Sequence, residues 1–298
     1  MNMNTALSLR GRRALAAARP RSRSTSRRMP AAVLVSVIWL AVVILAAITA
    51  PILPIPDPSV SDYAAVGAFP GQSLEHLLGA DQIGRDMLSR LITGAQVSLT
   101  VGVGSVLLGT IAGGFLGLAA GYFGGWWDRV LSVAIDIMLS FPGIVAIIAI
   151  TVFMGPSMST LVIGMGILFV PQLARVARSA TLSFAQREFV VAARGMGAGE
   201  FRILIREVLP NIVAAVVAYA TTLVAVAIVM EGGLSFLGLG VPAPQSSWGS
   251  MMGDGRASLK DSPHIVLLPA LVMCITLLAI NFVADYVSKR FDIRESVL

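Results

Sequence analysis

Six long apolar runs constrain the fold of this chain more than any other feature. Each run is long enough to cross roughly 30 Å of hydrocarbon as one helix. Hydrophobic residues make up 56% of the 298 residues and charged residues only 13%, whereas soluble domains carry about 25% charged residues. The sequence therefore predicts an all-α, polytopic membrane protein. The six predicted spans are residues 32–53, 98–121, 130–153, 158–177, 211–232 and 265–287.

The spans divide the chain into four parts. Residues 1–31 form a basic tail without apolar periodicity, which we expect to be disordered and to contact anionic membrane lipid. A cleavable signal peptide is the rival interpretation of this end. Residues 32–97 hold the first span and a polar extracytoplasmic segment, in which 84–96 suits an interfacial helix. Residues 98–287 form the membrane core, and residues 288–298 form a C-terminal tail.

Lysine and arginine are distributed unevenly between the connecting segments. Eighteen of the 22 lie on one side of the predicted spans, and only Arg85, Arg90, Arg256 and Lys260 lie on the other. Because cytoplasmic segments carry this excess, both termini are predicted to be cytoplasmic, as an even number of spans requires. The same asymmetry accounts for the pI near 10.2 without nucleic acid as a partner. The eighteen residues are Arg10, Arg12, Arg13, Arg19, Arg21, Arg23, Arg27, Arg28, Arg129, Arg175, Arg178, Arg187, Arg194, Arg202, Arg206, Lys289, Arg290 and Arg294.

The segment 181–210 is charged and amphipathic although it lies between two apolar runs. Two sets of apolar residues at helical spacing flank a stretch with three glycines, which predicts two helices joined by a turn outside the bilayer. Such an element is suited to docking by a partner protein. The alternative is an amphipathic helix that lies on the membrane surface. The first set is Phe189, Ala192, Ala193 and Met196, the glycines are Gly195, Gly197 and Gly199, and the second set is Phe201, Leu204, Ile205 and Val208.

This segment resembles the coupling loop of the permease subunits of ABC importers. The family motif reads Glu-Ala-Ala, three residues, Gly, nine residues, Ile, one residue, Leu-Pro. Here Val191 replaces the Glu and Glu207 replaces the Ile. Two more stretches, 76–99 and 233–252, resemble signature segments of the C-type permease of dipeptide and oligopeptide importers, so the resemblance runs from about Val33 to the C-terminus. The matching motif residues are Ala192, Ala193, Gly197, Leu209 and Pro210.

The resemblance implies the type I ABC importer fold and a transport function in a bacterial inner membrane. The chain would form a pathway for short peptides with a second, homologous permease subunit. An extracytoplasmic substrate-binding protein would deliver the cargo, and cytoplasmic ATP-binding subunits, on one fused chain or two, would hold ATP and magnesium. Other cargoes of the wider family are nickel complexes, opines, sugars and haem.

The sequence holds none of the catalytic motifs that would make the chain an enzyme. Walker A, HExxH and GxSxG patterns do not occur in it, so we expect no ATP hydrolysis, no cofactor and no catalytic or metal site in this chain. An intramembrane enzyme that pairs Asp136 with Glu231, and a purely structural scaffold, are the competing functions.

The coupling role is assigned to nine residues of the amphipathic segment. Gly197 would allow the turn between the two helices, Phe201 would fill a cleft of the ATP-binding partner, and the arginines would meet acidic groups there. The nine residues are Ala192, Ala193, Arg194, Gly197, Phe201, Arg202, Arg206, Leu209 and Pro210.

Four residues inside apolar runs are candidates for the pathway or its gate. A charge in hydrocarbon is unfavourable, so we expect Asp136 and Glu231 to face protein or water. Asp136 would pair with a basic residue of a neighbouring helix. Glu231 would serve an outer gate or act as a buried hydrogen-bonding group. Pro142 and Pro171 each remove an N–H donor, and they are expected to be static kinks or hinges.

Several other residues have two interpretations. A glycine every four residues on the second span predicts close helix packing, either with another subunit or within the chain. Trp248, in the polar loop 238–262, is expected to anchor the substrate-binding protein or to belong to an aromatic belt. His76 and His264 lack ligand spacing and are expected to be ordinary loop or interface residues. The glycines are Gly109, Gly113, Gly117 and Gly121.

Overall fold

The structure, a computed structural model, describes residues 29–295, and the predicted basic tail lies outside them except for its last three residues. The chain divides into two compact units, Met1–Ala31 and Ala32–Leu298, and the features below belong to the second. All regular elements of the described residues are helices. They are α2 (Ala31–Thr49), η1 (Tyr63–Ala65), α3 (Met87–Phe123), α4 (Gly125–Ser140), α5 (Gly143–Met154), α6 (Met158–Ala185), α7 (Glu188–Gly195), α8 (Glu200–Ile203), η2 (Leu204–Val208), α9 (Leu209–Phe236), α10 (Trp248–Gly255), η3 (Arg256–Ser258) and α11 (His264–Glu295).

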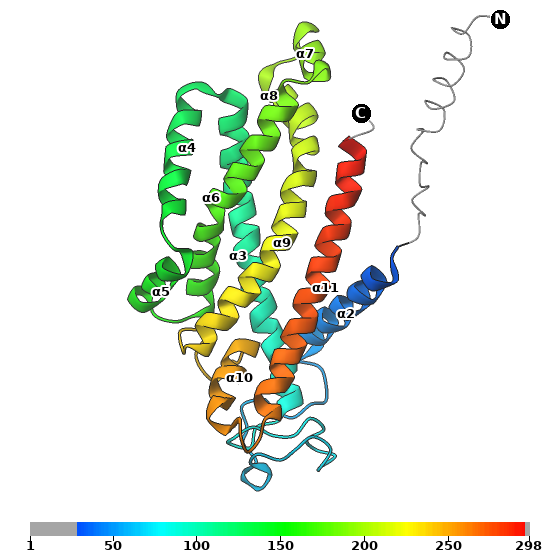
Figure 1. Cartoon of the computed structure of the whole chain (residues 1–298), viewed down its shortest axis with the longest axis vertical. Coiled ribbons are helices and arrows are strands. Elements are labelled where there is room, and N and C mark those ends of the chain that lie inside the picture. The colour runs from blue at the N-terminus through cyan, green and yellow to red at the C-terminus, as the bar shows by residue number, and fades with distance from the viewer. Residues whose placement is uncertain (1–28, 296–298) are drawn as a thin grey trace, which may run out of the picture. The chain divides into compact units, whose positions relative to one another are not determined.

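Long helices α3, α6, α9 and α11 form the body of the second unit (Figure 1). The short helices α7 and α8 lie at one end of this body, and α10 lies at the opposite end with the segment that precedes α3 (Figure 1). Five helices of the described residues are long and apolar enough to cross a membrane, and α4 with α5 makes a sixth if the pair counts as one broken span. The chain is therefore a multi-pass helical membrane protein.

The third predicted span is not a straight helix. Helices α4 and α5 meet at an angle of 82°, and Pro142 stands at the N-cap of α5. Proline disfavours helical geometry in the residue before it, and Phe141 is extended, with φ −85° and ψ 133°. The predicted span over 130–153 is therefore broken at Pro142, the residue expected to be a kink or a hinge, because Pro142 ends one helix and begins the next.

Two predicted boundaries also shift. The interfacial helix expected over 84–96 does not exist as a separate element, because α3 begins at Met87 and continues to Phe123. Its polar first turns are stabilised by protein partners, such as the carbonyl of Ala47, which accepts a 2.6 Å hydrogen bond from the Gln96 amide. At the other end of the chain, α11 extends through most of the tail predicted over 288–298.

The glycine stripe of α3 packs against α6 within the same chain. A β-carbon added to Gly113 would lie 2.5 Å from the carbonyl oxygen of Val170, and one added to Gly117 would lie 2.2 Å from that of Ala174. These distances are shorter than a van der Waals contact, so the two backbones approach as closely as hydrogen side chains allow. The packing interpretation of the stripe therefore holds along α3.

We expect Gly117→Ala to destabilise the fold by about 1–3 kcal/mol, because the added methyl group overlaps the α6 backbone. Thermal unfolding of the purified protein in detergent measures the effect. Gly114→Ala is a matched control on the same helix, because nothing lies within 4 Å of the position its β-carbon would take. Equal stability of the two variants would contradict this account of the α3–α6 contact.

Candidate functional site

The amphipathic segment forms a helical hairpin, residues 188–203, that consists of α7, a tight turn and α8. The turn is a Schellman motif with Gly197 in the left-handed region at φ +81°. The Gly197 N–H donates to the carbonyl of Arg194 at 3.0 Å, and the Ala198 N–H donates to that of Ala193 at 3.1 Å. This pattern satisfies the last carbonyls of α7 and favours glycine at the turn position. The structure thus places Gly197 where the sequence predicted the turn.

The apolar residues of the hairpin divide into a buried set and an exposed set. Met196 and Phe201 are 82% and 76% exposed, and Phe189 and Val191 are also exposed. Large apolar side chains grouped on a surface are typical of a docking site. The buried set packs on α3, α6 and α9, and it consists of Val190, Ala193, Ile203, Leu204 and Val208 with Leu118, Phe184 and Ile212.

A carboxylate holds the hairpin closed and ties it to α3. Glu200 accepts two hydrogen bonds from the guanidinium of Arg194, at 2.8 and 3.0 Å. The hydroxyl of Tyr122, on α3, donates to the same carboxylate. The Glu200 partner raises the pKa of Arg194 above its ordinary value, so this arginine stays charged. A displacement of the hairpin would therefore act on α3 through Glu200.

The remaining predicted coupling residues surround this hairpin. Ala192, Arg202 and Arg206 are exposed, and among residues 29–289 neither Arg202 nor Arg206 forms an ion pair. Leu209 and Pro210 open α9, and the π-helical turn η2 stands directly before them. The hairpin therefore continues into α9 through consecutive helical turns, with no loop between α8 and α9.

Glu231 lies in the interior near the opposite end of the long helices. Its side chain is 0% exposed and accepts hydrogen bonds from the hydroxyls of Ser98, at 2.9 Å, and Ser235, at 2.6 Å. The Ser98 oxygen in turn accepts a hydrogen bond from the backbone N–H of Trp248 at 3.3 Å. Glu231 thus links α9, α3 and α10 through buried hydrogen bonds.

Both interpretations of Trp248 were wrong, because its side chain is 0% exposed. The indole N–H donates to the carbonyl of Leu91 at 3.1 Å, and the ring packs in a cluster with Met87, Leu91 and Ala95. The sequence could not reveal this position, because α10 folds back against α3, α9 and α11.

The other pathway candidates lie apart from Glu231. Asp136, on α4, accepts a 2.6 Å hydrogen bond from Arg175, on α6, and both side chains are exposed. The basic partner on a neighbouring helix is the one that the sequence led us to expect. Pro142 stands at the α4–α5 break, and Pro171 is buried within α6. The structure therefore does not join Asp136 and Glu231 into a carboxylate pair, since they lie on different helices with separate partners.

Sequence reasoning missed an ionic cluster before and within the first turns of α3. The Asp81 carboxylate accepts from Arg85 Nε at 2.7 Å and from Arg90, and Asp254, on α10, lies 3.2 Å from Arg90. Burial raises the pKa of Asp81, but hydrogen bonds from the N–H groups of Arg85 and Ile83, together with both guanidiniums, outweigh it and lower the pKa. An arginine at the edge of an apolar run signals a partner, and Arg90 carries that signal in the sequence.

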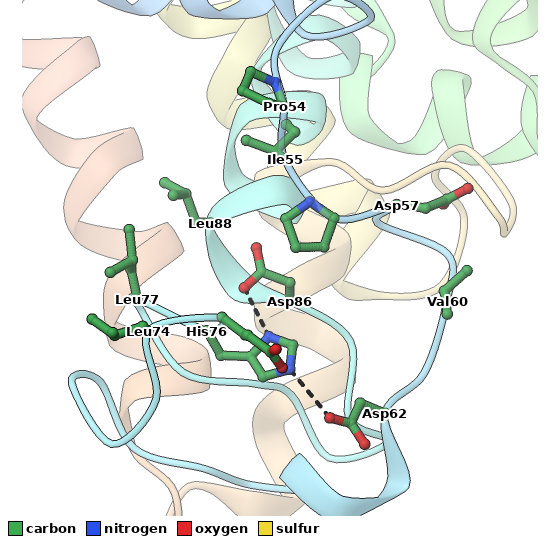
Figure 2. Close-up of a pocket in the computed structure, with 12 residues that line it drawn as sticks. Pro54, Ile55, Asp57, Val60, Asp62, Leu74, His76, Leu77, Asp86 and Leu88 are labelled. Carbon is green, nitrogen blue, oxygen red and sulfur yellow. Dashed lines mark hydrogen bonds and ion pairs between the residues drawn. The ribbon is translucent and has the colours of Figure 1, made fainter.

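His76 is also more constrained than a loop residue was expected to be. It is buried, and its ring stands between Asp62 and Asp86 beside a cavity of about 540 Å³ (Figure 2). His264 is buried as well, against Phe69. Within the described residues, no group of three or more His, Cys, Asp and Glu side chains is arranged to hold a metal ion.

Comparison with known proteins identifies the family. Residues 113–296 match the family described as binding-protein-dependent transport system inner membrane component. The glutathione transport system permease protein GsiD of Pectobacterium atrosepticum is 38% identical over 222 residues, which are 74% of each chain. Its counterpart from Escherichia coli O6:K15:H31 is 37% identical over 222 residues, which are 74% of this chain and 73% of that protein.

A solved structure has a similar fold. A chain of the MetNI methionine ABC transporter in inward-facing conformations aligns with a TM-score of 0.57 and 18% identity, over 69% of this chain and 97% of that chain. The helical body, together with the family match and the permease relatives, defines a membrane-spanning permease subunit of the ABC importer class. The chain belongs to the family of binding-protein-dependent transport system inner membrane components.

We expect Glu231→Gln to assemble normally and Glu231→Leu to lose about 1–3 kcal/mol of stability, because leucine leaves the Ser98 and Ser235 hydroxyls without their acceptor. Thermal unfolding and the yield of folded protein in detergent measure this difference. Normal transport by an assembled Glu231→Gln variant would assign Glu231 a structural role. Loss of transport by that variant, with assembly intact, would assign it to the gate.

Proposed function

We propose that the chain is the transmembrane permease of an ATP-driven importer of short peptides and transmits movement through the helical hairpin. One observation carries the proposal: two large apolar side chains, Met196 and Phe201, are exposed on a hairpin that is packed and hydrogen-bonded to the spanning helices. Burying apolar surface contributes roughly 25 cal/mol per Å². A protein with a matching apolar cleft would therefore bind the hairpin, and its movement would be transmitted to the membrane-spanning helices.

The proposed partner at the hairpin is an ATP-binding subunit. The exposed cationic groups of Arg202 and Arg206, which follow Phe201 in the sequence, favour a cleft with acidic groups at its rim. ATP and magnesium would be held by that partner. Closure of two nucleotide domains would move the hairpin, and α3 and α9 would follow it as the pathway alternates between its two sides.

The proposed assembly also includes a second permease and an extracytoplasmic binding protein. The family description, with its binding-protein-dependent transport system, supports the latter. Peptide cargo is supported by relatives whose name assigns them to glutathione transport, since glutathione is itself a small peptide.

The proposed orientation places the hairpin and both termini in the cytoplasm. The support is the asymmetry of Lys and Arg in the sequence: the predicted spans assign eighteen of them to the same side as the hairpin, and the segments that remain inside carry the excess of positive charge. The ionic cluster at Asp81 and the α10 helix then belong to the outer face.

We expect Phe201→Asp and Gly197→Pro to abolish cargo-stimulated ATP hydrolysis by the assembled transporter while the permease still inserts. The aspartate removes an apolar contact, and proline cannot adopt the positive φ of position 197. The activity of complexes in proteoliposomes measures the effect. Phe201→Leu is the matched control, because it keeps an apolar side chain and should retain most of the coupling; normal coupling in both Phe201→Asp and Gly197→Pro would refute this role for the hairpin.

We expect Leu74→Cys and Lys260→Cys to react with a membrane-impermeant maleimide added outside cells, and Arg129→Cys, near the start of α4 and outside the hairpin, to react only after permeabilisation. All three positions are exposed. A Cys274→Ser background removes the single native cysteine. Labelling of position 74 or 260 from the cytoplasm alone would show that the true orientation is the reverse of the proposed one.

A further inference from the structure

His76 stands between two carboxylates that come from separate parts of the chain (Figure 2). Its Nδ1 lies 3.1 Å from Asp86 Oδ1, and its Nε2 lies 3.5 Å from Asp62 Oδ2. A neutral imidazole carries a proton on only one ring nitrogen, so one carboxylate would then face a lone pair. Only the imidazolium offers an N–H group to both carboxylates. The geometry therefore calls for the charged form of His76.

Each of the two carboxylates also fixes a piece of backbone. Asp86 caps α3 by accepting from the Ser89 N–H at 2.7 Å. Asp62 accepts from the Ala64 N–H at 2.9 Å, and its own N–H donates to the carbonyl of Gly84 at 2.9 Å. His76 thus joins the polar segment that follows α2 to the first turn of α3.

The surrounding charges favour a proton on the ring. Asp57 and Glu75 line the same cavity, and the guanidiniums of Arg85 and Arg90 are occupied by Asp81 and Asp254. The hydrogen bond to Asp86 raises the pKa of His76, as does Asp62, and together they outweigh the burial that lowers it. Asp62 is half exposed, so protons can reach the ring from solvent.

We propose that His76 is a proton-operated clasp that holds the segment 54–86 against the start of α3. A raised folded-state pKa means that the clasp stabilises the fold fully below the ordinary histidine pKa near 6.5. That contribution is lost as the pH rises through the folded-state value. Deprotonation removes one donor and leaves two carboxylates facing a neutral ring, which loosens the segment. The clasp itself does not depend on the proposed orientation, which decides only the compartment whose pH it senses.

Hydrogen–deuterium exchange of the full-length chain in its purified transporter complex tests the clasp between about pH 6 and about pH 9, with rates corrected for intrinsic exchange. Peptides within residues 60–86 should lose protection at least about threefold across this range in the wild type. His76→Gln should be insensitive to pH, because glutamine does not titrate. Asp62→Asn keeps the side-chain shape and should move the midpoint to lower pH.

The other histidine supplies the matched control. His264 is buried, and its Nε2 lies 3.3 Å from the carbonyl oxygen of Ala80, so His264→Gln should leave the pH dependence of residues 60–86 in place. Three results would overturn the clasp. They are wild-type exchange that does not change with pH, a pH dependence that persists in His76→Gln, and a midpoint pH that is unchanged in Asp62→Asn. Because the readout is local protection, a failure of the proposed transport function would not alter it.

Discussion

Close contact between the backbones of α3 and α6 is the constraint on which the rest of this structure depends. Glycines at positions such as Gly113 and Gly117 let the α6 backbone approach to distances that any side chain would block. This contact fixes the C-terminal half of α3, and α3 carries groups at both ends of the molecule. Tyr122 holds the hairpin at one end, and Ser98 holds Glu231 towards the other. A single packed helix therefore connects the two regions that we assign to coupling and to the outer face.

The two ends of the helical body differ in the side chains that characterise them. Near the start of α3, buried charges such as Asp81 and Arg90 are matched with each other, because an unpaired buried charge is strongly unfavourable. At the hairpin, Met196 and Phe201 are exposed, although burial of such side chains stabilises proteins. The ion pairs of Asp81 and Arg90 let these charges be buried before and within the first turns of α3, whereas the exposed Met196 and Phe201 favour a partner protein at the hairpin.

Proteins with this fold belong to transport systems that are named for different cargoes. A methionine transporter chain has a similar fold at 18% identity, while the glutathione permeases that match at 37–38% identity carry another cargo in their name. The same helical body therefore serves different transport systems, and fold alone does not choose the cargo. The role that we propose for the tight turn at Gly197 and the exposed Phe201 is the transmission of movement, which is separate from the choice of cargo.

The sequence by itself determined the helical membrane class, the hairpin with its turn at Gly197 and the close packing of the glycine stripe, because hydrophobic length, periodicity and the special geometry of glycine are local properties. Only the tertiary structure decided the break at Pro142 as an 82° bend, the burial of Trp248 and the carboxylates on either side of His76. Those features depend on which segments meet after the chain folds back on itself. A tryptophan or histidine in a polar loop carries no local signal of the residues that will surround it.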